Sequence, residues 1–261
     1  MKQPSNNSTV YATVGQCIYC GSTNGKLSKE HILPFGLGGN LILPQASCLQ
    51  CAKITSQSEL VCLRIMFGSL RQSMDLPTRH PKKKPNKLHL EIIRPNGIVE
   101  WKGLSPKEMP KIIYGWHLPL PGILRNALPS ENVDGDMIVR YSNELSKYMQ
   151  PEGQRVKVGT FNILEFYRMI AKIAHAYTVA QIGINAFKPL VTDLILGKSK
   201  TPSFWIGGDR DGTQPATAGK HLHDLQLGSC VANNTEYVLA SVRLFSFANM
   251  PNYYVVVGEK L

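Results

Sequence analysis

Four of the six cysteines in this 261-residue chain have the spacing of metal ligands. They form two Cys-x-x-Cys pairs, Cys17/Cys20 and Cys48/Cys51. Such a turn places two thiolates on one side of a metal ion, and a second turn completes the tetrahedron that Zn²⁺ prefers. The alternative is two chance pairs of buried cysteines. The sequence therefore predicts one structural zinc site with these four ligands.

The segment between the two pairs holds a second group of reactive residues. Glu30 and His31 are adjacent, Pro34 follows them, and Asn40 comes directly after a Gly-Gly pair. Imidazole has a pKa near neutrality and suits a general base. Phosphodiester hydrolysis also needs a cation that offsets charge on the phosphate, and a carboxylate can bind one. These residue types are compatible with such metal-assisted acid–base chemistry, and a structural histidine in a degenerate domain is the alternative.

In this order the motifs resemble the HNH endonuclease superfamily, in the zinc-bearing subgroup written with Glu-His in place of Asp-His. The shared features are Cys-x-x-Cys, acid-His-Ile-x-Pro, Leu-Gly-Gly and a second Cys-x-x-Cys, within residues 17–59. The resemblance implies an N-terminal ββα-metal, treble-clef-like zinc module, in which a hairpin carries the Glu-His pair and a helix begins after the last cysteine. It also implies a metal-dependent endonuclease that hydrolyses phosphodiester bonds in DNA.

The resemblance assigns roles to individual residues. His31 is expected to be the general base, and Glu30 to bind a catalytic Mg²⁺ or another divalent ion. The family's middle Asn orients the histidine, and Asn40 is preferred for that role by residue type, with Gln45 as the alternative. Adjacent residues on a strand point to opposite faces, so we expect a local irregularity at Glu30-His31.

The helix ligand of the family is missing from its usual place. The family has His or Asn directly after the last cysteine, whereas this chain has Ala52, which cannot bind a metal ion. Residues i+3, i+4 and i+7 lie on the same helix face. The substitutes are therefore Thr55, Ser56 and Glu59, and Glu59 is the strongest ligand among them. We expect Glu59 to bind the catalytic divalent ion together with Glu30.

Several elements must position these residues. Apolar spacing predicts a helix over 52–76, and Asn-Gly between two β-prone runs predicts a hairpin over 88–101. The clearest helix covers about 161–187, with Thr160 or Asn162 as its cap. Strands are expected over 237–245 and 253–257.

The long helix over 161–187 is apolar nearly all round and is therefore expected to be central. One polar stripe interrupts its apolar surface. This stripe indicates either an internal ion-pair ladder or the solvent-facing edge of a packed helix, and a second pocket is the alternative. The stripe consists of Glu165, Arg168, Lys172 and His175.

Together these elements predict an α+β fold. Residues 1–76 are expected to form the zinc-bound HNH-like module with its following helix. Residues 77–87 are basic and rich in proline, which is typical of a linker or an exposed arm. Residues 88–261 are expected to form a larger α+β domain of unknown role around the central helix.

Charge favours a polyanionic partner. The formal net charge is +11 and the sequence pI is about 9.4, so counterion release from phosphates favours binding of nucleic acid, and the resemblance makes DNA the expected partner. Lys82, Lys83 and Lys84 are candidate phosphate contacts, and a solvated charged loop is the alternative. The polar N-terminus and the interrupted apolar stretch over 163–184 predict a cytoplasmic protein with no membrane partner.

Two other functions stay open at this point. One is a non-catalytic zinc module that binds nucleic acid and whose active site decayed with the loss of the helix ligand at Ala52. The other is a zinc-stabilised assembly or scaffold protein. The position of the Glu59 carboxylate discriminates between these classes, because an enzyme needs it near Glu30 and His31.

Overall fold

The computed structural model describes residues 8–150, 152–157, 159–210 and 218–261. Helices and strands are mixed within these residues, and the strands form several separate sheets. The predicted mixture of helices and strands is therefore confirmed. None of the helices in the described part of the chain has both the length and the apolar character that crossing a bilayer requires.

The N-terminal part combines a small sheet with a helical segment. Strand β2 (Ser28–His31) runs antiparallel to β3 (Leu41–Ser47), and β1 (Thr9–Val10) pairs in parallel with β3 on its other edge. Helix α1 (Leu49–Val61) follows directly, and one π-helical turn (Cys62–Met66) joins it to α2 (Gly68–Ser73). The predicted helix over 52–76 is thus real but is divided by this turn.

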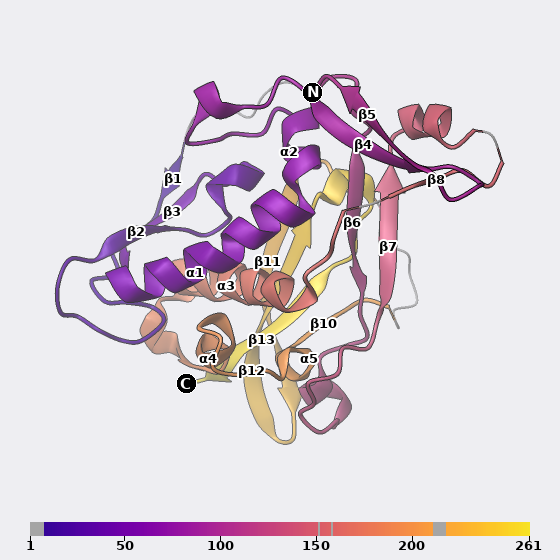
Figure 1. Cartoon of the computed structure of the whole chain (residues 1–261). Coiled ribbons are helices and arrows are strands. Elements are labelled where there is room, and N and C mark those ends of the chain that lie inside the picture. Colours follow the sequence, from indigo (N-terminus) through magenta and orange to yellow (C-terminus); the bar gives the residue numbers. More distant parts are fainter. Residues whose placement is uncertain (1–7, 151, 158, 211–217) are drawn as a thin grey trace.

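Helix α3 (Ile163–Ile182) lies at the centre of the molecule, as its apolar composition predicts. The side chain of Asn162 accepts a hydrogen bond from the Glu165 backbone N–H at 3.2 Å and caps the helix, as expected. α3 packs between α1 and the largest sheet, so that helix, helix and sheet form three successive layers (Figure 1).

The largest sheet is antiparallel and has the order β10-β13-β12-β11, with β9 also paired to β13. The two strands expected near the C-terminus are its centre, because they correspond to β12 and β13. The strand bounds are β9 Phe187–Pro189, β10 Ile206–Gly208, β11 His223–Ala232, β12 Thr235–Leu244 and β13 Tyr253–Lys260. Two short helices, α4 (Thr192–Ile195) and α5 (Pro202–Trp205), lie between β9 and β10 in the chain.

Two smaller sheets complete the fold. The predicted Asn-Gly hairpin is present as β4 (Leu88–Ile93) and β5 (Val99–Leu104), and β8 (Arg155–Val156) extends it beside β4. A second hairpin, β6 (Ile112–His117) with β7 (Asp136–Tyr141), lies in a region where the sequence gives no clear pattern.

One buried core joins the N-terminal part to the rest of the molecule. Ile32 and Phe67 belong to the same apolar cluster as Phe166 and Val255. The proposed boundaries at 76 and 88 stay a prediction, but residues on both sides of them share this core. The segment 77–87 between them is mostly exposed.

His223 on β11 fastens the loop between β2 and β3 to the largest sheet. Its Nε2 lies 2.8 Å from the Leu37 carbonyl oxygen, and its Nδ1 accepts a hydrogen bond from the Phe245 backbone N–H at 3.2 Å. A proton on Nδ1 would remove that acceptor. Removal from water lowers the pKa of His223 to about 4, although the Leu37 carbonyl favours the charged form.

We predict that this histidine makes folding stability depend on pH. Between its ordinary pKa of 6.5 and about 4, the unfolded state binds a proton that the folded state does not. The stability that His223 contributes is therefore present above pH 6.5 and is lost as the pH falls toward 4. Wild type should have a higher free energy of unfolding than His223→Gln at pH 7. This difference should decrease by up to about 1.4 kcal/mol for each pH unit below 6.5.

Denaturant unfolding followed by circular dichroism at several pH values measures this gap. The matched control is His89→Gln on β4, because His89 is exposed. A gap that stays constant from pH 7 to pH 4 would contradict the neutral, hydrogen-bonded state of His223.

Candidate functional site

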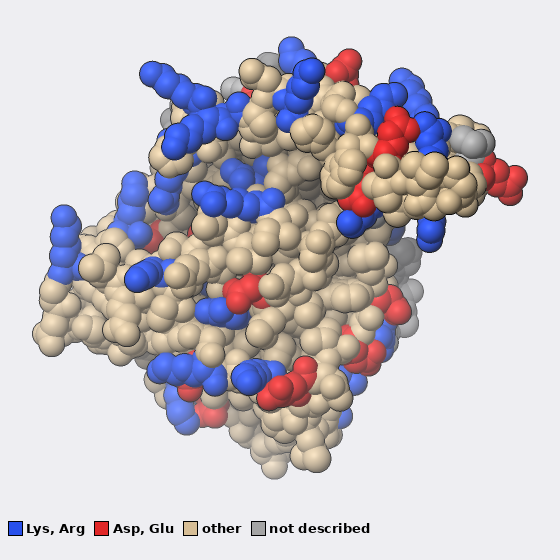
Figure 2. Space-filling model, viewed as in Figure 1, with Lys and Arg blue, Asp and Glu red and all other residues tan. Residues whose placement is uncertain are grey.

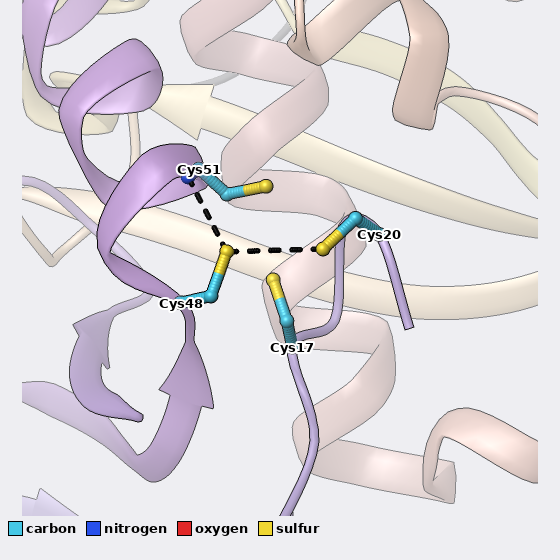
Figure 3. A group of neighbouring side chains, drawn as sticks. All are labelled: Cys17, Cys20, Cys48 and Cys51. Atoms are coloured by element: carbon cyan, nitrogen blue, oxygen red, sulfur yellow. Dashed lines mark hydrogen bonds between the residues drawn. The ribbon is translucent and has the colours of Figure 1, made fainter. Parts of the chain in front are cut away.

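The four predicted cysteine ligands come together in one cluster (Figure 3). Their sulfur atoms all lie within 4.8 Å of one another, and the Cys20 and Cys48 sulfurs are 3.8 Å apart. A tetrahedral ion with metal–sulfur bonds of about 2.3 Å separates its sulfurs by about 3.8 Å. All four are free thiols rather than disulfides. The cluster is therefore compatible with a structural metal site.

Each pair of cysteines is positioned by local backbone structure. The first pair lies in a turn closed by hydrogen bonds from Gly21 N–H to the Cys17 carbonyl and from Cys17 N–H to Ser22, both 2.8 Å. The second pair begins α1, where the Cys48 sulfur accepts the Cys51 N–H at 3.5 Å. Burial raises the pKa of the Cys48 thiol, but hydrogen bonds from the Cys51 backbone and with the neighbouring thiols lower this pKa to about 7. The start of α1 thus favours the Cys48 thiolate, whereas burial raises the pKa of Cys17 and of Cys51.

Glu30 and His31 lie at the end of β2, on opposite faces of the strand. Glu30 pairs with Leu43 and His31 with Ile42 in regular register. The irregularity expected at this pair instead lies just before it, between Ser28 and Glu30. The expected position of the irregularity was therefore wrong. The extra residues are in β3, where Pro44 has no N–H to donate to the strand pairing and Gln45 has a φ of 48°. As a result, the Glu30 side chain is buried and the His31 side chain is half-buried on the other face.

The Gly-Gly pair shapes the loop that returns to β3. Gly38 has a φ of 86°, which residues other than glycine rarely adopt. A Cβ on Gly39 would lie only 2.1 Å from the Leu33 carbonyl oxygen, so no larger residue fits there. Asn40 follows in an exposed position, and its carbonyl accepts a hydrogen bond from Thr9 N–H at 2.9 Å. The role of Asn40 in orienting His31 stays a prediction.

The two carboxylates assigned to the catalytic ion do approach each other, but a lysine lies between them. The ammonium of Lys172 on α3 is 2.6 Å from Glu30 Oε1 and 2.7 Å from Glu59 Oε1. It also donates hydrogen bonds to the carbonyl oxygens of His31 and, at 3.4 Å, Ile32. The Lys172 side chain is only 2% exposed. Burial disfavours its charge, but the two carboxylates outweigh this and raise its pKa above the ordinary value.

The residues of this cluster do not fit a divalent ion as they stand. A positive ammonium already contacts both carboxylates, and an added cation would be repelled by it at short range. The other helix substitutes are also occupied, since the Thr55 and Ser56 hydroxyls donate to the Cys51 and Lys53 carbonyls at 3.1 and 2.9 Å. Among the described residues, the four cysteines are the only group of three or more His, Cys, Asp or Glu side chains close enough to share a metal ion.

The His31 side chain has a cationic environment. Burial lowers the pKa of His31, and the positive charges of Lys172, Lys29 and Arg79 lower it further. The imidazole is therefore neutral at pH 7 and able to accept a proton. Its ring packs edge-on against Phe35, with 6.0 Å between the ring centroids.

The basic run Lys82, Lys83 and Lys84 lies in the exposed segment between α2 and β4. Lys82 and Lys83 are exposed, whereas the Lys84 ammonium pairs with Asp75 at 2.5 Å. Figure 2 shows Lys and Arg side chains gathered on the upper left of this face of the molecule, over the N-terminal sheet and this segment. Lys29 and Arg79, whose positive charges lower the pKa of His31, are also exposed.

The polar stripe of α3 is an internal ladder that contacts the N-terminal part. Arg168 pairs with Glu165 at 2.9 Å, Lys172 binds the two carboxylates, and His175 Nε2 lies 2.7 Å from the Ile18 carbonyl between the first two cysteines. An internal ion-pair ladder was one of the predictions for this stripe. The sequence did not indicate that the stripe contacts the Glu-His motif and the cysteine turn.

Comparison with known proteins adds no relative: no family model, no curated protein and no solved structure matches the chain. Any function of this chain is therefore inferred from the geometry of these residues.

We predict that the cysteine cluster stabilises the N-terminal part through a bound metal ion. Structural zinc in small domains contributes about 10–16 kcal/mol of apparent binding free energy, which becomes folding free energy. Cys17→Ser or Cys48→Ser should therefore lose the metal and lower the melting temperature, as measured by elemental analysis and differential scanning calorimetry.

The control for that comparison is Cys230→Ser, because Cys230 lies on β11 outside the cluster. A wild-type protein without metal, or a disulfide that joins these cysteines, would contradict the prediction.

Proposed function

We propose that this chain is a zinc-stabilised, HNH-type endonuclease that acts on phosphodiester bonds in DNA, with His31 as its general base. The observation that carries the proposal is a neutral, half-buried imidazole at the end of β2 with the cations Lys29 and Arg79 near it. A base and fixed positive charges at one surface are what phosphodiester hydrolysis requires.

The proposed metal at the four cysteines is Zn²⁺, in the setting of a ββα-metal module. Four thiolates form a soft ligand set, and the Sγ spacing fits tetrahedral coordination. The order β2, β3, α1 supports this description, since a hairpin carries the Glu-His pair and the helix begins beside the last two cysteines. With all four positions taken by protein, this ion supplies stability and has no open site for substrate.

The reaction that we propose uses groups of the chain itself. The unprotonated ring nitrogen of His31 accepts a proton from water while the water oxygen attacks phosphorus. The bond between phosphorus and the leaving oxygen breaks, and this oxygen keeps the bonding electron pair and takes a proton from solvent. Lys29 and Arg79 are placed to offset the charge that develops on the phosphate. The resemblance implies an additional Mg²⁺ at Glu30 and Glu59, but the residues there do not fit it, and no step is derived through that ion.

A second candidate is a non-catalytic zinc module that binds DNA. The specific observation in its favour is the ion pairing of both Glu30 and Glu59 with Lys172. On this proposal the basic surface and the zinc-stabilised hairpin serve binding, and the carboxylates serve only packing. The two candidates share the DNA partner and differ in whether the phosphodiester bond breaks.

We predict that His31→Ala lowers DNA cleavage by about 10²–10⁴-fold, the usual contribution of a positioned base. Because a general base acts mainly in the transition state, DNA affinity should change little. Nicking of supercoiled plasmid by the zinc-loaded protein, without added metal and with a panel of divalent metals, measures the rate. Fluorescence anisotropy measures affinity.

His89→Ala is the matched control, since it removes an exposed imidazole from β4. If wild type cuts nothing in any of these conditions yet still binds DNA, the non-catalytic module is the correct alternative. Equal cleavage by His31→Ala and wild type would remove His31 from the chemistry.

We also predict that DNA binding depends steeply on salt. Each phosphate contact contributes about 0.9 to the slope of log K against log salt for duplex DNA. Removal of Lys82, Lys83 and Lys84 together should flatten that slope by about 2 to 3 units if they bind phosphates. The control is a triple variant of equal charge at exposed Lys188, Lys198 and Lys260, which should change it less. Equal slopes for both variants would show that the run 82–84 makes no special contact.

A further inference from the structure

A lysine ammonium lies where a metal ion would have to bind. Glu30 comes from β2, Glu59 from α1 and Lys172 from α3, so three separate elements meet at this point. The buried Tyr19 belongs to the same surroundings, where burial and the negative charges of Glu30 and Glu59 raise its pKa. All four side chains are largely removed from solvent.

The charges of this cluster are nearly balanced without a metal ion. Two carboxylates and one ammonium leave at most one negative charge. A divalent ion would add two positive charges and reverse the sign of the cluster, in a place with little water to screen it. The Lys172 ammonium therefore offsets the carboxylate charge that a metal ion would otherwise offset.

Lys172 has no easy way to leave. Its ammonium also binds the carbonyl oxygens of His31, the last residue of β2, and of Ile32, which follows it. The Lys172 side chain is almost completely buried, and its neighbours Ile170 and Ile173 on α3 are fully buried. Displacement of the ammonium would leave two carbonyls and two carboxylates without this donor, which is costly in a buried place.

We propose that Lys172 is the resident cation of this site: its ammonium takes the place of a divalent ion between Glu30 and Glu59. The wild-type chain then binds no divalent ion at these carboxylates, and any hydrolysis at His31 proceeds without one there. The proposal concerns the occupant of the site and holds whether or not the protein cuts DNA.

The test measures Mn²⁺ binding to the zinc-loaded full chain by electron paramagnetic resonance and isothermal titration calorimetry. Wild type should bind no more Mn²⁺ than Glu30→Gln does. Lys172→Met keeps the length of the side chain but removes the charge, and it should gain at least about tenfold in Mn²⁺ affinity because the repulsion is gone. That gain should vanish in Lys172→Met with Glu30→Gln.

Lys188→Met is the matched control, because Lys188 is an exposed lysine that pairs with Glu259 at 3.5 Å. It should not change Mn²⁺ binding. Wild-type protein that binds one Mn²⁺ per chain and loses it in Glu30→Gln would overturn the proposal. A folded Lys172→Met protein with no gain in affinity would also overturn it.

A stability comparison decides the matter if Lys172→Met does not fold. Glu30→Gln with Glu59→Gln leaves the ammonium buried without its counterions and should lower the melting temperature strongly. Addition of Lys172→Met to that pair should restore part of the loss, because the unpaired charge is removed. If the third change lowers the melting temperature further, the ammonium is not held there by the two carboxylates and the proposal fails.

The metal assay also separates this proposal from the proposed function. Cleavage by the zinc-loaded protein without added divalent metal, and with no Mn²⁺ at Glu30, supports both. Cleavage that requires Mn²⁺ bound at Glu30 supports the endonuclease and overturns the role of Lys172. Absence of cleavage, with no Mn²⁺ at Glu30, leaves Lys172 as the resident cation in a DNA-binding module.

Discussion

A charged lysine in the core is the constraint on which the arrangement of this molecule depends. Removal of one ammonium from water costs on the order of several kcal/mol unless opposite charges and acceptors replace the lost solvent. Lys172 finds both in the N-terminal part, at Glu30, Glu59 and the carbonyl of His31. The central helix can therefore occupy its place only when the hairpin and α1 are correctly placed against it.

Two kinds of interaction hold the N-terminal part together and connect it to the rest of the molecule. The four thiols bring the turn of Cys17 and Cys20 against the start of α1. Hydrogen bonds to backbone carbonyls connect this N-terminal part to the rest: His175 binds Ile18, Lys172 binds His31, and His223 binds Leu37. All three donors come from residues beyond 160, and the acceptors are main-chain oxygens in the cysteine turn, at the end of β2 and in the loop between β2 and β3. Backbone acceptors leave the side chain of His31 free for the solvent face.

Local chemistry made much of this predictable, and long-range pairing did not. The cysteine spacing, the Asn162 cap and the Asn-Gly hairpin are each determined within a few residues, and each is present. Strand β11 escaped notice although Asn233 and Asn234, both with positive φ, form the two-residue turn that joins it to β12. The partners of Lys172 could not be found this way, because nothing near a lysine in the chain reveals which distant carboxylate it meets. The sequence shows that Ala52 offers no metal ligand, but it does not show that Lys172 lies between Glu30 and Glu59.

The distance along the chain between Lys172 and its partners has a consequence for synthesis. Lys172 and the carbonyl that it binds at His31 are 141 residues apart. The cysteines and both carboxylates leave the ribosome long before α3, so the cysteine turn can close while Glu30 and Glu59 are still hydrated. At the usual pace of about 5–20 residues per second, several seconds pass before the ammonium arrives. During that interval the nascent hairpin exposes the surface that α3 later covers, and a divalent ion or a chaperone has its only unhindered access to the carboxylate pair.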